Sequence, residues 1–171
     1  MMSIKSRDKK SEQIMENAHS INLNNLKNIS NDYILLNETE IYEFIKDMDD
    51  FLGLINDSLG IFKKYFPNAK YYLALEEDCE CSDLDDIVAY IVNKDGSFDE
   101  NYETGEILFK DLLKLKDTYP DAWLKFDYIV EDDDEYYELW RRGMIDNYWL
   151  FNGGDLMNEL KILIHHISLP I

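Results

Sequence analysis

The chain has 171 residues, of which 46% are hydrophobic and 13% aromatic, and its formal net charge is -19. This length and hydrophobicity allow a substantial core, which excludes general disorder and favours one domain. So acidic a chain repels nucleic acid and anionic membranes and attracts basic proteins, so we expect no direct nucleic-acid partner and no membrane partner. No uninterrupted apolar run is long enough to span a bilayer.

The first thirty residues differ from the rest in charge. Residues 1–30 hold five basic and three acidic groups, whereas residues 31–171 hold twelve basic and thirty-three acidic groups, a net of -21. The basic stretch 1–10 leads into a polar segment, which excludes a secretory signal. We therefore expect a mobile N-terminal arm over residues 1–30 and an acidic domain over residues 31–171.

The first predicted helix is long. Residues 33–36 suit either a short strand or a hydrophobic staple, and Asn37 followed by Glu40 is typical of a capping box at a helix start. Apolar residues then recur at helical spacing from Ile41 to Phe66, for about seven turns. Glycine weakens this pattern, so two helices with a break over residues 53–56 are the alternative.

An aromatic-Pro-Asx-Ala pattern occurs twice, as Phe66-Pro67-Asn68-Ala69 and as Tyr119-Pro120-Asp121-Ala122. Proline disfavours helix at the residue before it and cannot continue helical hydrogen bonding, so each copy predicts a helix end followed by a strand. The recurrence indicates either an internal duplication or a common joint repeated by chance.

Three strands are predicted from apolar patterns. The run 86–93 has apolar residues at both parities, which predicts that both faces are covered, whereas 123–130 alternates as a half-exposed strand does. The predicted strands are 70–76, 86–93 and 123–130.

A loop is predicted over 98–103, and the segment 148–151 suits a short strand or a buried turn. Helical spacing predicts the remaining helices over 104–118, 136–142 and 156–167. The order α-β-β-α-β-α-α predicts a single α+β domain, with a small mixed sheet of three to four strands and helices mainly on one face. A direct pairing of the second and third strands would require a right-handed crossover through the helix between them.

The segment from Lys64 to Leu75, with Asp78 and residues 87–92, resembles a motif of small uncharacterised bacterial proteins. In that motif a helix ends in Phe-Pro-x-Ala and is followed by a strand, an Asp-Pro-Glu turn and a second strand. Here Cys79 stands where the motif has proline. The resemblance covers about a third of the chain and implies a bacterial, intracellular α+β protein without implying an activity.

The two cysteines, Cys79 and Cys81, are one residue apart. Side chains at this spacing in an extended strand point to opposite faces, which disfavours a disulfide between them. They are typical of reduced thiols, so we expect a cytoplasmic location.

No familiar catalytic motif is present. The sequence has no glycine-rich phosphate loop, no nucleophile elbow and no His-Glu-x-x-His, and adjacent His165 and His166 would diverge on a helix. Residues 95–106 resemble a calcium loop in part, but Glu100 occupies the position that needs glycine. We therefore expect no catalytic residue, no metal ligand and no cofactor.

Carboxylates and aromatic residues interleave in the second half of the chain. An acidic rim around an aromatic centre suits capture of a basic partner, because charge raises the association rate and Tyr and Trp anchor interfaces. The sequence therefore predicts a non-enzymatic acidic inhibitor of a basic protein, either a toxin-neutralising immunity protein or a nucleic-acid mimic. The predicted partner-binding residues are Glu76, Glu77, Asp78, Glu80, Asp83, Asp85, Asp86, Glu131, Asp132, Asp133, Asp134, Glu135, Tyr136 and Tyr137.

Alternative interpretations remain for each part of this hypothesis. The carboxylates of residues 76–86 could hold a divalent cation in an enzyme, or could form a solvated loop between strands. The chain could also be a structural subunit of an assembly. Any single aromatic residue could belong to the core.

Overall fold

The computed structural model describes residues 28–48, 50–77 and 81–144. In this part of the chain, four strands form one sheet in the order β1-β2-β3-β4. β1 runs parallel to β2, β2 antiparallel to β3, and β3 parallel to β4. The predicted α+β fold with a small mixed sheet is confirmed. The strands are β1 (Ile34–Leu35), β2 (Lys70–Glu76), β3 (Asp86–Val92) and β4 (Phe126–Glu131).

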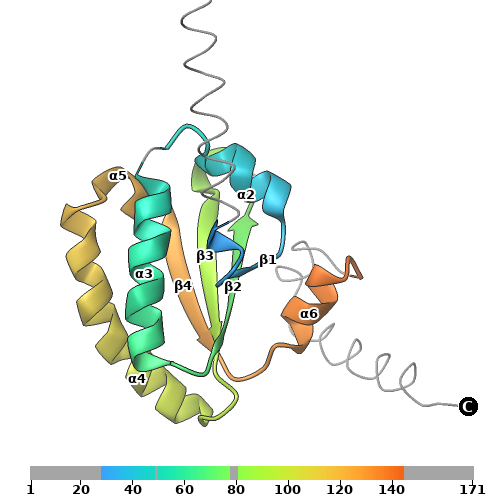
Figure 1. Cartoon of the computed structure of the whole chain (residues 1–171), viewed down its shortest axis with the longest axis vertical. Coiled ribbons are helices and arrows are strands. Elements are labelled where there is room, and N and C mark those ends of the chain that lie inside the picture. Colours follow the sequence, from blue (N-terminus) through green and yellow to red (C-terminus); the bar gives the residue numbers. More distant parts are fainter. Residues whose placement is uncertain (1–27, 49, 78–80, 145–171) are drawn as a thin grey trace, which may run out of the picture.

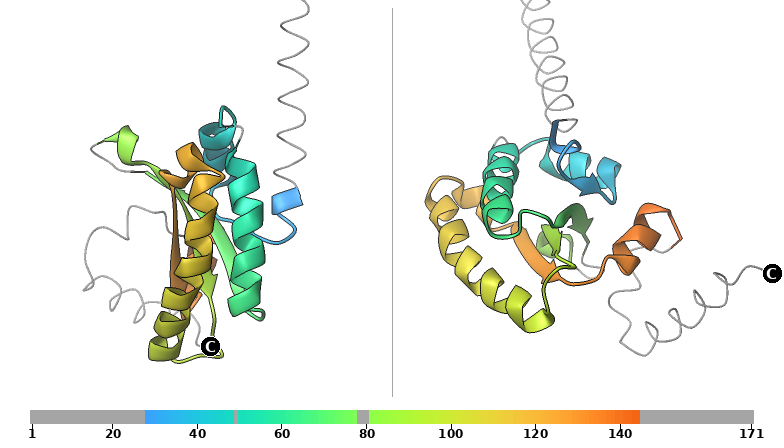
Figure 2. Two further views of the ribbon diagram at one scale, coloured as in Figure 1. Left: turned by 90° about the vertical axis from the view of Figure 1, so that its left-hand side faces the viewer. Right: turned by 60° about the horizontal axis from the view of Figure 1, so that its bottom comes forward.

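The helices form one main layer and one smaller layer. Side chains of α2, α3 and α4 pack into a core on one face of the sheet, and α6 packs on the opposite face (Figures 1 and 2). A 3-10 turn, η1 (Ser82–Leu84), lies between β2 and β3, and η2 (Leu113–Asp117) follows α4. The helices are α2 (Glu38–Ile45), α3 (Phe51–Tyr65), α4 (Phe98–Leu112), α5 (Pro120–Trp123) and α6 (Glu135–Arg141).

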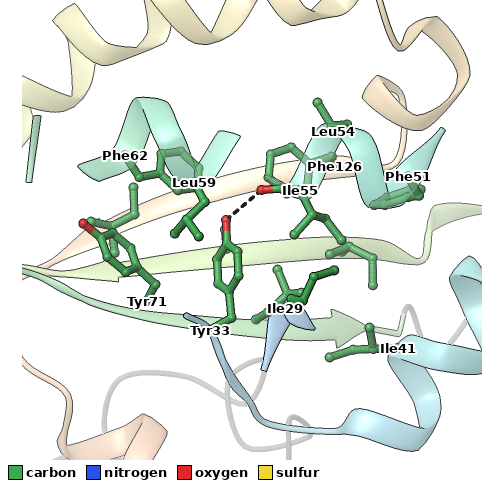
Figure 3. Packing of buried hydrophobic residues seen from close by; sticks show 14 of the residues in the cluster. Ile29, Tyr33, Ile41, Phe51, Leu54, Ile55, Leu59, Phe62, Tyr71 and Phe126 are labelled. Atoms are coloured by element: carbon green, nitrogen blue, oxygen red, sulfur yellow. Dashed lines mark hydrogen bonds between the residues drawn. The ribbon is translucent and has the colours of Figure 1, made fainter. Parts of the chain in front are cut away.

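The larger core lies between α3 and the sheet. Phe51, Ile55 and Phe62 project from one side of α3 and are fully buried (Figure 3). Tyr33 reaches the same core and donates its hydroxyl to the Ile55 carbonyl oxygen at 3.3 Å, as Figure 3 shows. Burial raises the pKa of this phenol well above its ordinary value. Each such buried apolar side chain contributes about 1.5–3 kcal/mol, so the α3 face supplies much of the stability.

The single long helix predicted from Ile41 to Phe66 was wrong. The chain leaves helical geometry after α2 and re-enters it at Phe51, so the break precedes the predicted position at residues 53–56. Gly53 lies inside α3, where an added Cβ would stand 2.7 Å from Tyr119 Cε1. This glycine therefore admits a neighbouring ring rather than ending the helix.

The capping box predicted at Asn37 was also wrong. Asn37 is the N-cap of α2, but its side chain makes no capping hydrogen bond. Its Nδ2 donates to the Leu75 carbonyl oxygen at 2.8 Å, and the Leu75 N–H donates to its Oδ1 at 2.9 Å. The amide thus continues the pairing of the short β1 with β2.

The loop predicted over residues 98–103 is the first part of α4. Ser97 Oγ accepts the Glu100 N–H, and the Glu100 carboxylate accepts the Ser97 N–H at 2.9 Å. This reciprocal capping satisfies two donors that a helix start leaves unpaired. The hydrogen bonds also lower the pKa of Glu100.

A strand was predicted directly after the second aromatic-Pro-Asx-Ala copy, but the structure has a short helix there. Pro120 is the first residue of α5, a position that tolerates its missing N–H, and β4 begins only at Phe126. The predicted strand start at Trp123 was therefore wrong. The first copy behaves as expected, because α3 ends at Tyr65 and β2 follows. The segments predicted at 148–151 and 156–167, and the arm up to residue 27, lie outside the described residues.

Candidate functional site

The first predicted acidic segment begins at one end of the sheet. Glu76 of β2 stands opposite Asp86 of β3, and Asp127 of β4 stands opposite Val88. Burial raises the pKa of Glu76, and the charges of Asp127 and Asp86 raise it further. Burial also raises the pKa of Asp86, although Lys125 opposes the shift. Charge repulsion within this group thus adds to burial in raising the pKa values of Glu76 and Asp86.

The remainder of this segment is mostly open to solvent. Glu77 and Asp83 are exposed and Asp85 is half-buried, whereas Asp78 and Glu80 lie outside the described residues. Among the residues that the structure describes, no group of three or more His, Cys, Asp or Glu side chains is placed to hold a metal ion.

The second predicted segment contains a buried carboxylate, Asp134, that is paired with two half-exposed lysines. Asp134 accepts a hydrogen bond from Lys70 at 2.6 Å and is paired with Lys94 as well. Burial raises the pKa of Asp134, but its hydrogen bonds to both lysines outweigh burial and lower that pKa to about 2. Tyr72 donates its hydroxyl to Glu138 at 2.7 Å and lies 3.3 Å from Asp134. These contacts fix the start of α6 against β2 and β3.

The tyrosines of this segment form a second core. Tyr136 and Tyr137 are buried with Trp140 against the sheet, and the Tyr137 ring lies 4.5 Å from that of Tyr90. The pKa of Tyr137 is raised, first by burial and then by the charge of Glu131. These aromatic residues have the internal position that was the alternative to an exposed binding centre.

The other acidic residues of this segment differ in exposure. Asp132 and Asp133 are exposed, while Glu131 and Glu135 are half-buried. Burial raises the pKa of Glu131, and the adjacent Asp132 adds to that shift. Asp132 and Asp133 are thus the carboxylates of this segment that a partner could reach, and one oxygen of Asp133 already accepts the Glu135 N–H at 2.9 Å.

A hollow that the sequence did not indicate lies between α4 and β4. We call it the α4–β4 groove, and its volume is about 510 Å³. Three large aromatic side chains of α4 border it while staying in contact with solvent: Phe98 is 68% exposed, Tyr102 is 60% exposed and Phe109 is 44% exposed. The groove is lined by Phe98, Asn101, Tyr102, Gly105, Glu106 and Phe109 of α4, and by Asp127, Tyr128, Ile129 and Val130 of β4.

Two contacts set the distance between α4 and β4. Gly105 is buried, and a Cβ at this position would come within 3.4 Å of Val130 Cγ2. Tyr128 donates its hydroxyl to the Gly105 carbonyl oxygen at 3.1 Å. The middle of α4 is therefore held close to β4 beside the groove.

The groove carries negative charge that the protein does not neutralise internally. Glu106 lines it, Glu103 is exposed on the same helix, and neither forms an ion pair within the described part of the chain. Asp127 is exposed on β4, and its carboxylate accepts the Tyr128 N–H at 2.8 Å. The exposed aromatic rings and the carboxylate of Glu106 thus lie next to each other in the groove. A correct assignment of the Ser97–Glu100 capping box would have revealed this helix face.

No family model, curated protein or solved structure matches this chain. The helices of the described ranges include none with the length and apolar character needed to cross a membrane. The residues and their geometry are therefore the basis for assigning a function.

Proposed function

We propose that this protein is a non-enzymatic acidic binding protein that captures a basic protein partner at the α4–β4 groove. One observation carries the proposal: the exposed rings of Phe98, Tyr102 and Phe109 border a groove that also contains the unpaired Glu106. The whole chain has a formal net charge of -19, which attracts a basic surface over a distance.

The two kinds of side chain have separate roles in this proposal. Carboxylates at the rim accelerate encounter with a basic protein and contribute modestly to affinity, because solvent screens them. Aromatic rings lose their contact with water on binding and therefore govern the lifetime of the complex. Clusters of exposed aromatic residues beside a hollow are typical of interfaces, whereas single exposed apolar residues are ordinary.

The acidic segments predicted from the sequence contribute in two ways. Asp134, Tyr136 and Tyr137 stabilise the fold, as their burial indicates. Exposed residues such as Asp83 and Asp132 add to the long-range field. In an immunity protein or a nucleic-acid mimic, such carboxylates occupy the places that phosphates would take on the basic partner.

Binding to a small basic nuclease over a salt series tests the proposal. The affinity should fall as the salt concentration rises, because salt screens exposed charges. The double variant Glu103→Gln/Glu106→Gln should bind about threefold to tenfold more weakly, from about 0.5 kcal/mol per exposed charge. The matched control is Glu38→Gln/Glu40→Gln, which removes two exposed charges from α2.

Two results would contradict the proposal. Tight binding that does not change between low and high salt would exclude electrostatic capture. An equal loss of affinity in both double variants would show that net charge acts without the groove. Phe98→Ala should shorten the lifetime of the complex with little effect on the association rate.

A further inference from the structure

β4 is the outermost strand on its side of the sheet, as far as the described residues extend. Ile87 stands opposite Phe126 and donates its N–H to the Lys125 carbonyl oxygen at 2.9 Å. At the other end, the Asn93 N–H donates to the Glu131 carbonyl oxygen at 2.8 Å. In a parallel ladder only alternate residues turn their backbone groups toward the neighbour, and here these are the odd-numbered residues of 125–131.

The even-numbered residues of β4 therefore direct their backbone polar groups away from β3. Phe126, Tyr128 and Val130 are these residues, and Tyr128 and Val130 line the α4–β4 groove. The Tyr128 N–H is taken by the carboxylate of the preceding Asp127 at 2.8 Å. A side chain thus occupies the place where a neighbouring strand would offer a carbonyl oxygen. Because Asp127 is exposed, its carboxylate can move aside at small cost.

We propose that the groove accepts an extended segment of the basic partner, which adds to the sheet as a strand beside β4. The proposal rests on the function proposed above and specifies how the partner is held. Main-chain hydrogen bonds to an exposed sheet edge give affinity in this mode, and pockets for alternate side chains give specificity. β4 has six residues, so about six partner residues would pair with it.

The two sides of such a strand would meet different surroundings. Side chains on the helix side would contact the rings of Phe98, Tyr102 and Phe109, which favours apolar or aromatic residues there. Side chains on the opposite side would lie near Asp127 and Glu131, which favours lysine or arginine. The segment that fits is therefore one that alternates apolar and basic residues.

Charge also selects the occupant. A second copy of this chain would bring its own acidic edge, with Asp127 and Glu131, against the same carboxylates, and like charges on adjacent strands are destabilising. Acidic side chains at an edge are one way in which proteins avoid pairing with themselves. The edge therefore rejects another acidic strand and admits a basic one.

A peptide pair gives the test. The probe is an acetylated and amidated heptapeptide in which lysine alternates with valine and phenylalanine, and its matched control is the same peptide N-methylated at its three central amides. The control keeps every side chain and charge. Its three central amides cannot donate hydrogen bonds to β4, whichever side of the peptide faces that strand. We expect the unmethylated peptide to bind the full chain at least tenfold more tightly. The Tyr128 amide proton should shift on its addition.

Variants locate the site. Tyr102→Ala should weaken binding of the unmethylated peptide about tenfold, whereas Leu124→Ala, which removes another exposed apolar side chain, should leave it unchanged. Equal binding of the two peptides would overturn the strand proposal and leave electrostatic capture intact. If neither peptide binds but the basic nuclease does, the strand proposal is overturned and the proposed function stands. If neither the peptides nor the nuclease bind, both proposals fail.

Discussion

Asp134 allows a quantitative prediction, because burial and two lysines act on it in opposite directions. Its ordinary pKa is 3.8, and the pKa in the folded protein is about 2. A difference of this size corresponds to about 2 kcal/mol in favour of the charged, folded form. Lys70 and Lys94 are half exposed, so solvent screening reduces the expected contribution to about 1–2 kcal/mol. Asp134→Asn should lower the free energy of unfolding at pH 7 by this amount.

Urea unfolding followed by tryptophan fluorescence measures the change. Asp132→Asn is the matched control, since it removes one exposed charge from the same loop and should change stability by less than about 0.5 kcal/mol. A lowered pKa stabilises the fold above the ordinary pKa, and this contribution is lost as the pH falls through the folded value. The two proteins should therefore converge in stability between about pH 4 and pH 2.

The sign of the effect should reverse when the lysines are removed. In a Lys70→Met/Lys94→Met background, Asp134 would be a buried carboxylate without those two cations, and burial alone opposes its charge. Asp134→Asn should then raise the free energy of unfolding. The reasoning is refuted if Asp134→Asn costs nothing in the native background, or costs the same in both backgrounds.

Three further changes test the fold. In α3, Gly53→Ala should lower the free energy of unfolding by about 1–3 kcal/mol, because its Cβ would meet Tyr119 at 2.7 Å. Gly60→Ala, with nothing within 4 Å of the added Cβ, should raise it by about 0.5–1 kcal/mol. Equal shifts of the two variants in urea titrations would contradict this contrast. Asn37→Asp should lower the free energy of unfolding by about 1–3 kcal/mol, since a carboxylate cannot donate to the Leu75 carbonyl oxygen of β2. A higher Tm of this variant would instead indicate that residue 37 caps α2. Burial raises the pKa of Glu76, so Glu76→Gln should raise the Tm at pH 7. The native protein should gain stability as the pH falls from 7 toward 4.5, and a variant with the same gain would show that Glu76 is not its source.

The sheet was predictable where the sequence pattern is strong and local. The bounds of β2 match the predicted run 70–76, and β3 ends one residue before the predicted 86–93. Both are continuous apolar runs between polar segments, and both are covered on two faces, which leaves little freedom in their assignment. The helix predicted over 136–142 corresponds to α6, and Gly143 follows it with a φ of +69° that favours glycine.

The sequence-based predictions fail where residues distant in the sequence determine the local structure. Nothing near Gly53 in the sequence indicates the Tyr119 ring that it accommodates, and nothing near Asn37 indicates the backbone of Leu75. The candidate groove was missed for a different reason. The sequence pattern predicts a loop over residues 98–103, and this prediction hides the exposed helix face that includes Phe98.

The small layer formed by α6 has a consequence for native-state dynamics. Seven helical residues are held to the sheet by three aromatic side chains and by the Asp134 ion pairs, whereas α3 buries six of its residues. Detaching α6 exposes far less apolar area than unfolding the whole domain and therefore costs less free energy. In hydrogen-exchange measurements, the amides of α6 should lose protection through a sub-global opening while those of α3 exchange only on complete unfolding. That opening would briefly hydrate Tyr72 and Tyr90, the aromatic residues at the centre of the sheet.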